Sequence, residues 1–427
     1  MKLKLVRNQL LVAVVGSLCC VPSTQTAMAK NVVKKATLVN VNGINYKLDA
    51  KNQEARLVTG NGTYTGDIVV PEKFTEDSIT YYVEEIDAGA FKDCSSLTGI
   101  SIPKTVKKIG SSAFDGCTAL EKVNLPGSIT KLESETFAQC SSLRRIELPE
   151  NLKELSQGVF KSCSALEEIA IPHSVTSLPR NLFLGCSSLT QVSLPAGLEK
   201  IGAAAFQDCS SLENIDLPNG LKSIDNGCFK NCSSLKSFTV PAGMEKLANN
   251  LFEGCSVLGK VSIAASVKDI GNSVFKGCVT LDSLRLPNGT KAMGNGVFED
   301  CSNLQHVSLP VSLKSIPSKT FKGCSSLVGV KIPNSVKEIE SDAFKSCGSI
   351  ESIEIPSSVE EIGGGAFEDC KSLTMVTLRS GRPVKIKKST FDKSMQKEGT
   401  FYVPVAGVYV NDPKSIWSKF SNVESNR

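Results

Sequence analysis

The chain has 427 residues, of which 41% are hydrophobic, 21% are charged and only 6% are aromatic. These proportions are ordinary for a folded chain and too apolar for a disordered one. The formal net charge of +5 is small for this length, so the composition gives no reason to expect binding to nucleic acid or to an anionic membrane surface.

The first 29 residues have the pattern of a secretory signal. A basic stretch precedes an apolar run over residues 10–18, and a polar stretch then ends in Ala27–Ala29. We expect cleavage after Ala29 and an exported protein that is secreted or held at the cell surface, with the periplasm as an alternative. The apolar run is too short for a permanent membrane helix, so we expect no stable membrane insertion after cleavage. Cys19 and Cys20 leave open an alternative in which a lipid-modified cysteine anchors the chain.

Residues 30–78 predict a small β cap. They contain the strand-like stretches GINYKLD, EARLVTG and GDIVVP, which are separated by glycine-rich turns.

From residue 79 to residue 378 the sequence repeats with a period of 23 residues. Thirteen phenylalanines recur at this step from Phe91 to Phe367, and thirteen cysteines follow them three residues later, from Cys94 to Cys370. A fixed period without insertions means that each unit forms one coil of a solenoid, with the phenylalanines stacked in one continuous core.

Each 23-residue unit divides into two extended pieces and a compact turn. Apolar residues alternate at the end of the unit, as in a short strand with one buried face, and a proline follows almost every such strand. We predict a mainly β fold with short helical turns: a right-handed solenoid of about 13 full coils plus caps, with a parallel β-sheet along it.

Fourteen cysteines lie beyond residue 29, and the sequence favours buried, reduced thiols for them. A disulfide ladder is an alternative in an exported protein, but the cysteines recur singly and stacked side chains point in parallel. Metal binding is disfavoured, because the chain has no C-x-x-C pair and its two histidines, His173 and His306, fall in different units.

Residues 379–427 predict an atypical last repeat and a C-terminal cap. The stretch VKIKKSTF repeats the pattern one residue late, placing Phe391 in the phenylalanine column and Ser394 at the cysteine position. The stretch FYVP, which starts at Phe401, is the expected last strand. All six tyrosines and the single tryptophan, Trp417, lie before Phe91 or after residue 378, where we expect their rings to seal the ends of the core.

Charged residues at the outward positions of the strands are the candidate binding residues. They form columns in which opposite charges alternate, so they either pair with one another across the sheet or present a surface to a partner. The candidates are Lys122, Arg144, Arg145, Glu167, Glu168, Arg285, His306 and Lys331.

The sequence contains no catalytic motif, so we expect no enzyme, no cofactor and no metal site. Carboxylates on a β-solenoid can hydrolyse polysaccharides, which makes several residues worth considering. Their repeat-equivalent neighbours differ in type, as at solvated surface positions. These carboxylates are Glu147, Glu167, Glu168, Glu213 and Asp216.

The units resemble the BspA-like leucine-rich repeat, whose consensus is close to IPxSVxxIGxxAFxxCSSLxxIxL. Residues 332–336, Ile339, Ala343, Phe344 and Cys347 match it, and the resemblance covers residues 80–378 in full. The family implies a leucine-rich-repeat solenoid and a surface-exposed or secreted protein, several members being adhesins. The resemblance therefore implies an extracellular protein ligand, such as a host matrix protein or a protein of another cell. A polysaccharide-binding or polysaccharide-cleaving solenoid and a passive surface spacer are the alternatives.

Overall fold

The computed structural model describes residues 37–59 and 64–426. The expected signal, residues 1–29, and the two cysteines considered for lipidation lie outside the described residues. Within the described ranges, no helix is both long enough and apolar enough to cross a membrane.

The chain begins with a five-stranded sheet that joins the first coil of the solenoid. Its strand order is β1-β2-β3-β6-β5, and β6 also pairs in parallel with β8 of the next coil. An Asn42–Gly43 turn with positive φ at both residues closes the β1–β2 hairpin, as such two-residue turns require. The strands are β1 (Thr37–Val41), β2 (Ile44–Asp49), β3 (Glu54–Leu57), β5 (Lys73–Glu76), β6 (Ile79–Ile86) and β8 (Lys108–Ile109).

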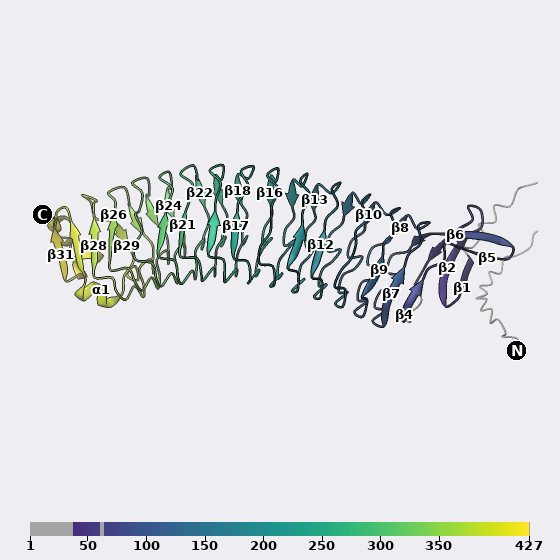
Figure 1. Ribbon diagram of the computed structural model, residues 1–427. Helices are drawn as coiled ribbons and strands as arrows, with labels where there is room; N and C mark the ends of the chain where they lie inside the picture. Colours follow the sequence, from purple (N-terminus) through teal and green to yellow (C-terminus); the bar gives the residue numbers. More distant parts are fainter. Residues whose placement is uncertain (1–36, 60–63, 427) are drawn as a thin grey trace, which may run out of the picture. The chain divides into compact units, whose positions relative to one another are not determined.

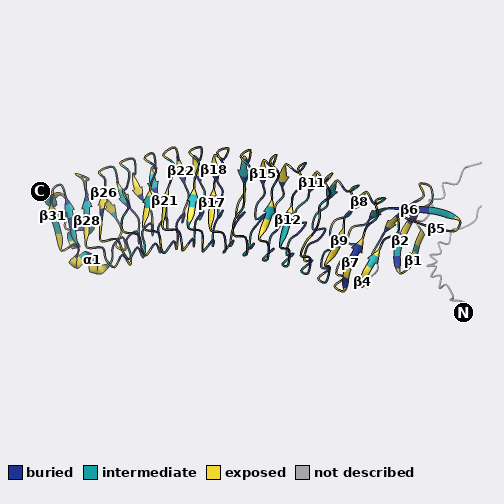
Figure 2. Ribbon diagram, viewed as in Figure 1, coloured by how far each residue is buried: buried dark blue, intermediate teal, exposed yellow. Residues whose placement is uncertain are grey.

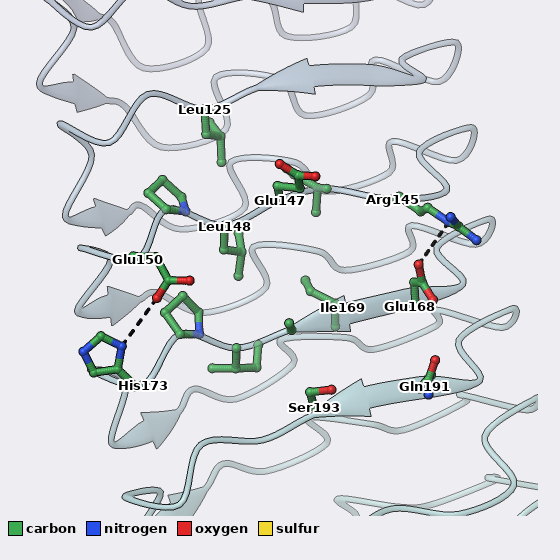
Figure 3. A pocket seen from close by; sticks show the side chains of 15 residues that line it. Leu125, Arg145, Glu147, Leu148, Glu150, Glu168, Ile169, His173, Gln191 and Ser193 are labelled. Carbon is green, nitrogen blue, oxygen red and sulfur yellow. Dashed lines mark ion pairs between the residues drawn. The ribbon is translucent and has the colours of Figure 1, made fainter.

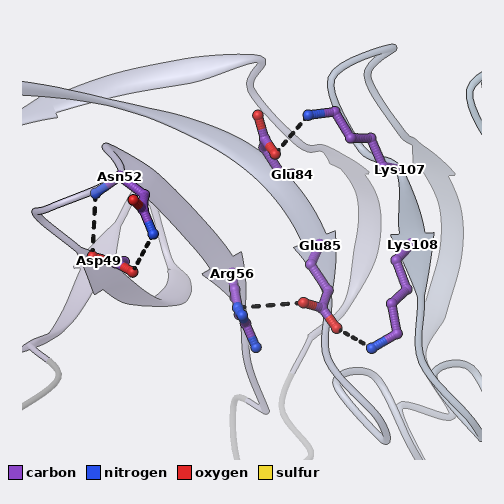
Figure 4. A network of polar contacts seen from close by, with 7 residues as sticks. All are labelled: Asp49, Asn52, Arg56, Glu84, Glu85, Lys107 and Lys108. Atoms are coloured by element: carbon purple, nitrogen blue, oxygen red, sulfur yellow. Dashed lines mark hydrogen bonds and ion pairs between the residues drawn. The ribbon is translucent and has the colours of Figure 1, made fainter.

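Ion pairs also join this sheet to the first coil (Figure 4). Glu85 on β6 accepts from Arg56 on β3 at 3.3 Å and from Lys108 on β8 at 2.6 Å. The hydrogen bond to Glu85 raises the pKa of Lys108 above its usual value. Lys107 pairs with Glu84 at 2.8 Å beside them. The charges thus follow the parallel pairing across the junction.

Two rows of short strands run along the solenoid, one strand of each row to most coils (Figure 1). The row that precedes the prolines is called here the long row. Its strands are β4 (Gly66–Val69), β7 (Leu97–Ser101), β9 (Lys122–Asn124), β12 (Glu168–Ala170), β14 (Gln191–Ser193), β17 (Ser237–Thr239), β19 (Lys260–Ser262), β21 (Ser283–Arg285), β23 (His306–Ser308), β26 (Ser352–Ile355), β28 (Met375–Leu378), β30 (Thr400–Val403) and β31 (Asn422–Ser425).

The other row, called here the short row, consists of two-residue strands beyond β6. These are β8, β10 (Lys131–Leu132), β11 (Glu154–Leu155), β13 (Ser177–Leu178), β15 (Lys200–Ile201), β16 (Ser223–Ile224), β18 (Lys246–Leu247), β20 (Asp269–Ile270), β22 (Ala292–Met293), β24 (Ser315–Ile316), β25 (Glu338–Ile339), β27 (Glu361–Ile362) and β29 (Lys385–Ile386).

Pairing in both rows is parallel and in register with the repeat. Ile169 of β12, for example, lies opposite Val192 of β14, which is 23 residues later. The long row is nevertheless not one continuous sheet. It divides into the ladders β4-β7-β9, β12-β14, β17-β19, β21-β23 and β26-β28-β30-β31. Most coils offer only three strand residues before the proline, so few hydrogen bonds resist a change of twist between neighbouring coils.

The core of the solenoid is a stack of phenylalanine rings. Every ring from Phe91 to Phe391 stacks on the next, with centroids 5.1–6.0 Å apart. This column confirms the expected internal spine and includes Phe391, which is one residue out of register in sequence. The alternation of buried and exposed residues follows from it, since one side of each strand contacts the spine (Figure 2).

The fourteen cysteines from Cys94 to Cys370 are buried free thiols, which confirms the favoured interpretation. From Cys117 onward, each cysteine that follows a spine phenylalanine donates its thiol to the phenylalanine carbonyl of the preceding coil. Cys209, for example, lies 3.2 Å from the carbonyl oxygen of Phe183, which also accepts the Cys186 amide at 3.0 Å. Burial raises the pKa of the Cys163 thiol to about 12 and so suppresses the reactive thiolate.

Aromatic rings cover both ends of the spine, as the sequence predicts. The ring of Tyr64 lies 4.9 Å from that of Phe91 at the first end. At the other end Phe391 meets Phe401 edge-on at 5.1 Å, and Trp417 lies 5.6 Å from Phe401. The Trp417 indole donates to the carbonyl of Val384 at 2.9 Å, so its only polar atom is paired while the ring is buried.

The C-terminal cap contains the only helices among the described residues. They are α1 (Lys393–Glu398), α2 (Ala406–Val410) and the 3₁₀ helix η1 (Ile416–Lys419). The predicted strand at FYVP is confirmed as β30, but the prediction that it is the last strand was wrong, because β31 follows β30 and pairs with it in parallel. β31 has a single apolar residue, Val423, and one apolar residue gives no alternating pattern that would predict a strand.

Candidate binding surface

The outward side chains of the long row form an exposed surface that extends from coil to coil. In β12 the side chain of Ile169 is buried, whereas Ala170 is exposed and Glu168 is half-buried. The same alternation recurs along the row because every strand packs one side against the spine (Figure 2). We call this surface, formed by the exposed and half-buried residues of the long-row segments, the long-row face.

Four of the predicted site residues form two ion pairs on this face. Arg144 Nη1 lies 2.8 Å from Glu167, and Arg145 Nε lies 3.2 Å from Glu168. The two arginines are 73% and 69% exposed, so each pair contributes only about 0.2–1 kcal/mol to stability. The interpretation as mutual pairing across neighbouring coils is therefore confirmed for these four residues.

The other four predicted residues are spread along the face. Lys122 lies on β9, Arg285 on β21 and His306 on β23, and Lys331 follows one coil later. His306 lies opposite Ser283, so it does not face Arg285. Within the described ranges none of these four side chains makes an ion pair.

Of five hollows on the long-row face, the largest has a volume of about 890 Å³ and lies beside residues 145–148 (Figure 3). Its lining includes the apolar side chains of Leu148 and Ile169. Charged residues line it as well, and His173 Nδ1 lies 3.5 Å from Glu150 Oε2. Ala170 also lines the hollow, and it is a small residue in a column that has Glu147 before it and Ser193 after it.

Two further hollows, of about 550 and 470 Å³, adjoin the largest one. All three share Arg145, and the three linings together extend from Asp67 to Ser193. We call the three hollows together the N-terminal groove. Two other hollows, of about 750 and 510 Å³, lie farther along the same face around Lys260 and Arg285.

Five of the residues predicted from the sequence line this groove, namely Lys122, Arg144, Arg145, Glu167 and Glu168. Glu150 and His173 also line it but were not predicted. These two residues follow the proline by one position in successive units, outside the strand columns that were inspected. The column gives only a weak signal for the hollow, namely two consecutive small residues, Ala170 and Ser193, after Glu147.

Three of the carboxylates considered for hydrolysis are engaged in ion pairs. Of the five carboxylates considered for hydrolysis, Glu167, Glu168 and Glu213 are paired with Arg144, Arg145 and Lys236, respectively. In the part of the chain that the structure describes, no three His, Cys, Asp or Glu side chains come together in a way that could hold a metal ion.

Comparisons with known proteins agree with this architecture. The family model for the BspA type leucine-rich repeat region (6 copies) matches residues 72–190, 176–305 and 291–405. No curated protein matches the chain significantly. Among solved structures, a leucine-rich repeat protein from Bacteroides ovatus is 30% identical, with a TM-score of 0.74, and the match covers 86% of this chain and 99% of that one.

Two other solved structures are similar at greater distance. A leucine-rich cell surface protein from Faecalibacterium prausnitzii is 25% identical over 81% of this chain and 95% of its own, with a TM-score of 0.55. The pneumococcal vaccine antigen PcpA shares the fold, at 20% identity over 92% of this chain and 99% of its own, with a TM-score of 0.57. The predicted leucine-rich-repeat solenoid is thus confirmed, and the chain belongs to the BspA-type leucine-rich repeat family.

Proposed function

We propose that this protein is exported and binds other proteins through its long-row face, as an adhesin for host matrix proteins or for proteins of other cells. The observation that supports this function best is the face itself, which presents outward side chains on coil after coil of a rigid core. The similarity to a cell surface protein of Faecalibacterium prausnitzii supports the proposed location.

The lining of the hollows favours a protein ligand over a polysaccharide. Sugar-binding grooves commonly use exposed aromatic rings for stacking. Among the described residues that line the five hollows, Phe238 is the one aromatic side chain, and it is buried. Charged and polar side chains alternate with aliphatic ones in these linings, which suits a protein surface.

A binding screen with two matched variants tests the proposal. The full chain is immobilised and exposed to matrix proteins, to cells and to a glycan array. Ala170→Trp places a large ring in the lining of the largest hollow, whereas Ser177→Trp places the same ring at an exposed position of β13, the next strand of the short row. We expect protein capture that Ala170→Trp weakens at least tenfold and that Ser177→Trp leaves within twofold. Binding to glycans alone, release of sugars, or equal loss in both variants would contradict the proposal.

A further inference from the structure

We propose that the N-terminal groove binds an extended, positively charged peptide segment of the partner protein. This inference rests on the proposed protein-binding function and names the chemistry of the partner. Three separate features of the groove support it: its residual charge, its unpaired backbone groups and its apolar lining.

The residual charge of the groove is negative once its internal ion pairs are taken into account. Arg144 and Arg145 are already paired with carboxylates of the next coil. Lys122 is the remaining lysine or arginine of the lining, and it makes no ion pair among the described residues. The carboxylates left without a lysine or arginine partner outnumber it; they are Asp67, Glu121, Glu147 and Glu150.

The carboxylates of the groove are also accessible to a ligand. Glu150 is 87% exposed, and its partner His173 is charged only when protonated. Glu121 and Glu147 are exposed on consecutive coils. A ligand with several positive charges can therefore pair with these carboxylates without breaking an existing ion pair to a lysine or an arginine. A polyanion would instead be repelled, because the groove, in the described part of the chain, has four carboxylates without a lysine or arginine partner but only one unpaired lysine or arginine, Lys122.

The backbone beside the largest hollow has unused hydrogen-bonding capacity. Residues 145–148 form no strand, and within the described part of the chain their N–H and C=O groups make no backbone hydrogen bond. By contrast, the equivalent residues 168–170 form β12 and pair with β14. The backbone groups of residues 145–148 lie in the plane of the sheet, toward the neighbouring coils, so a peptide that crosses the coils reaches them with polar side chains rather than with its own backbone.

The apolar lining suits the stems of lysine and arginine. Leu125 and Leu148 are only partly buried, and both line the largest hollow. Long cationic side chains bury their methylene groups on such surfaces while the charged head stays near carboxylates or water. A small cation such as a metal ion would leave this apolar surface unused.

The length of the groove sets the length of the ligand. From Asp67 to Ser193 the groove crosses five coil-to-coil steps, which is about 24 Å at the usual strand spacing. An extended peptide rises about 3.4 Å per residue, so roughly seven or eight residues span the groove. An alternating pattern of lysine and a small polar residue would direct its charges to one side.

The test uses three fluorescein-labelled peptides of about eight residues with alternating Lys-Ser, Gln-Ser or Glu-Ser sequence. Fluorescence anisotropy measures their binding to the full chain at low and at high NaCl concentration. We expect the Lys-Ser peptide to bind, and to bind less tightly at high salt, because exposed charges are screened. We expect the other two peptides to bind at least tenfold more weakly.

Two charge-reversing variants locate the site. Glu147→Lys changes the groove, and Asp216→Lys changes the equivalent exposed position three coils away. We expect Glu147→Lys to weaken binding of the Lys-Ser peptide at least tenfold and Asp216→Lys to weaken it less than twofold. Equal weakening by both, or equal binding of the Gln-Ser peptide, would overturn the inference.

The outcomes separate this inference from the proposed function. If Ala170→Trp abolishes capture of a protein but the Lys-Ser peptide does not bind, the partner chemistry proposed here is wrong and the protein-binding function stands. If the Lys-Ser peptide binds in the groove but the screen captures no protein, the site stands and the adhesin function is wrong.

Discussion

Ala204 has a left-handed backbone conformation, with φ at +53°, in the turn of its coil. Gly227 occupies the equivalent position one coil later, with φ at +61°. A side chain at Gly227 would meet no atom closer than 3.9 Å, so space is not what requires glycine there. The comparison isolates the conformational cost. An L-residue in this left-handed region destabilises the folded state by about 1–2 kcal/mol, whereas glycine does not.

We predict opposite effects for the two exchanges at this turn position. Ala204→Gly should stabilise the protein by about 0.5–1 kcal/mol, because relief of the left-handed conformation exceeds the entropy that glycine adds to the unfolded chain. Gly227→Ala should destabilise it by a similar amount. Guanidinium unfolding of both variants measures the difference. Two changes of the same sign would show that packing rather than backbone conformation governs this turn.

At the scale of the turn elements, a column of alternating charges links neighbouring coils. Glu299 lies 3.0 Å from Lys276 of the preceding coil and 3.1 Å from Lys322 of the following one. Its side chain is only 10% exposed. Burial acts to raise the pKa of Glu299, but the hydrogen bonds from the two lysines prevail and hold it below its usual value.

The lowered pKa predicts how the contribution of Glu299 depends on pH. A carboxyl whose pKa is lowered by folding stabilises the folded state above its unfolded pKa, and this contribution is lost as the pH falls through the folded pKa. We therefore expect Glu299→Gln to be destabilising at pH 7 and the difference from the wild type to shrink toward pH 3. Urea unfolding of the variant and of the wild type at both pH values measures this difference in the free energy of unfolding. Glu121→Gln, at an exposed site without an ion pair among the described residues, serves as the control.

At the scale of the whole molecule, the phenylalanine column joins the coils into one continuous hydrophobic core. Phe367 belongs to the last regular repeat, and in a terminal coil the loss of a ring is expected to cost less than the loss of an interior ring, because one neighbouring coil is missing. The structure changes that expectation, because Phe367 stacks on Phe344 and on Phe391, at 5.2 Å from each. Phe391 is in turn covered by Phe401 and Phe420 of the cap.

We now predict similar losses of stability for Phe206→Ala and Phe367→Ala. Each variant creates a cavity between two stacked neighbours, which costs about 3–5 kcal/mol. Chemical unfolding of the two variants at the same protein concentration gives the ranking. A loss at Phe367 less than half of that at Phe206 would mean that the cap does not complete the spine.

Much of the candidate surface could be predicted because it follows from the repeat. The 23-residue step places Arg144 beside Glu167 and Arg145 beside Glu168, so their pairing was foreseeable from the columns alone. The position of the hollow beside Ala170 could not be predicted from the columns. A hollow depends on how far neighbouring coils turn relative to each other, and the strand sequence of residues 145–148 looks like that of its neighbours.

By itself, the sequence determined the coil, the spine and the burial of the thiols, because a strict period forces equivalent residues to stack and only one side of each strand can face the core. The tertiary structure alone decided where the long row separates into short ladders, that Phe401 and Phe420 cover Phe391, and that a further strand, β31, pairs with β30. These features arise from the twist between coils and from contacts among residues of different units. Such effects accumulate over many residues, and no single repeat encodes them.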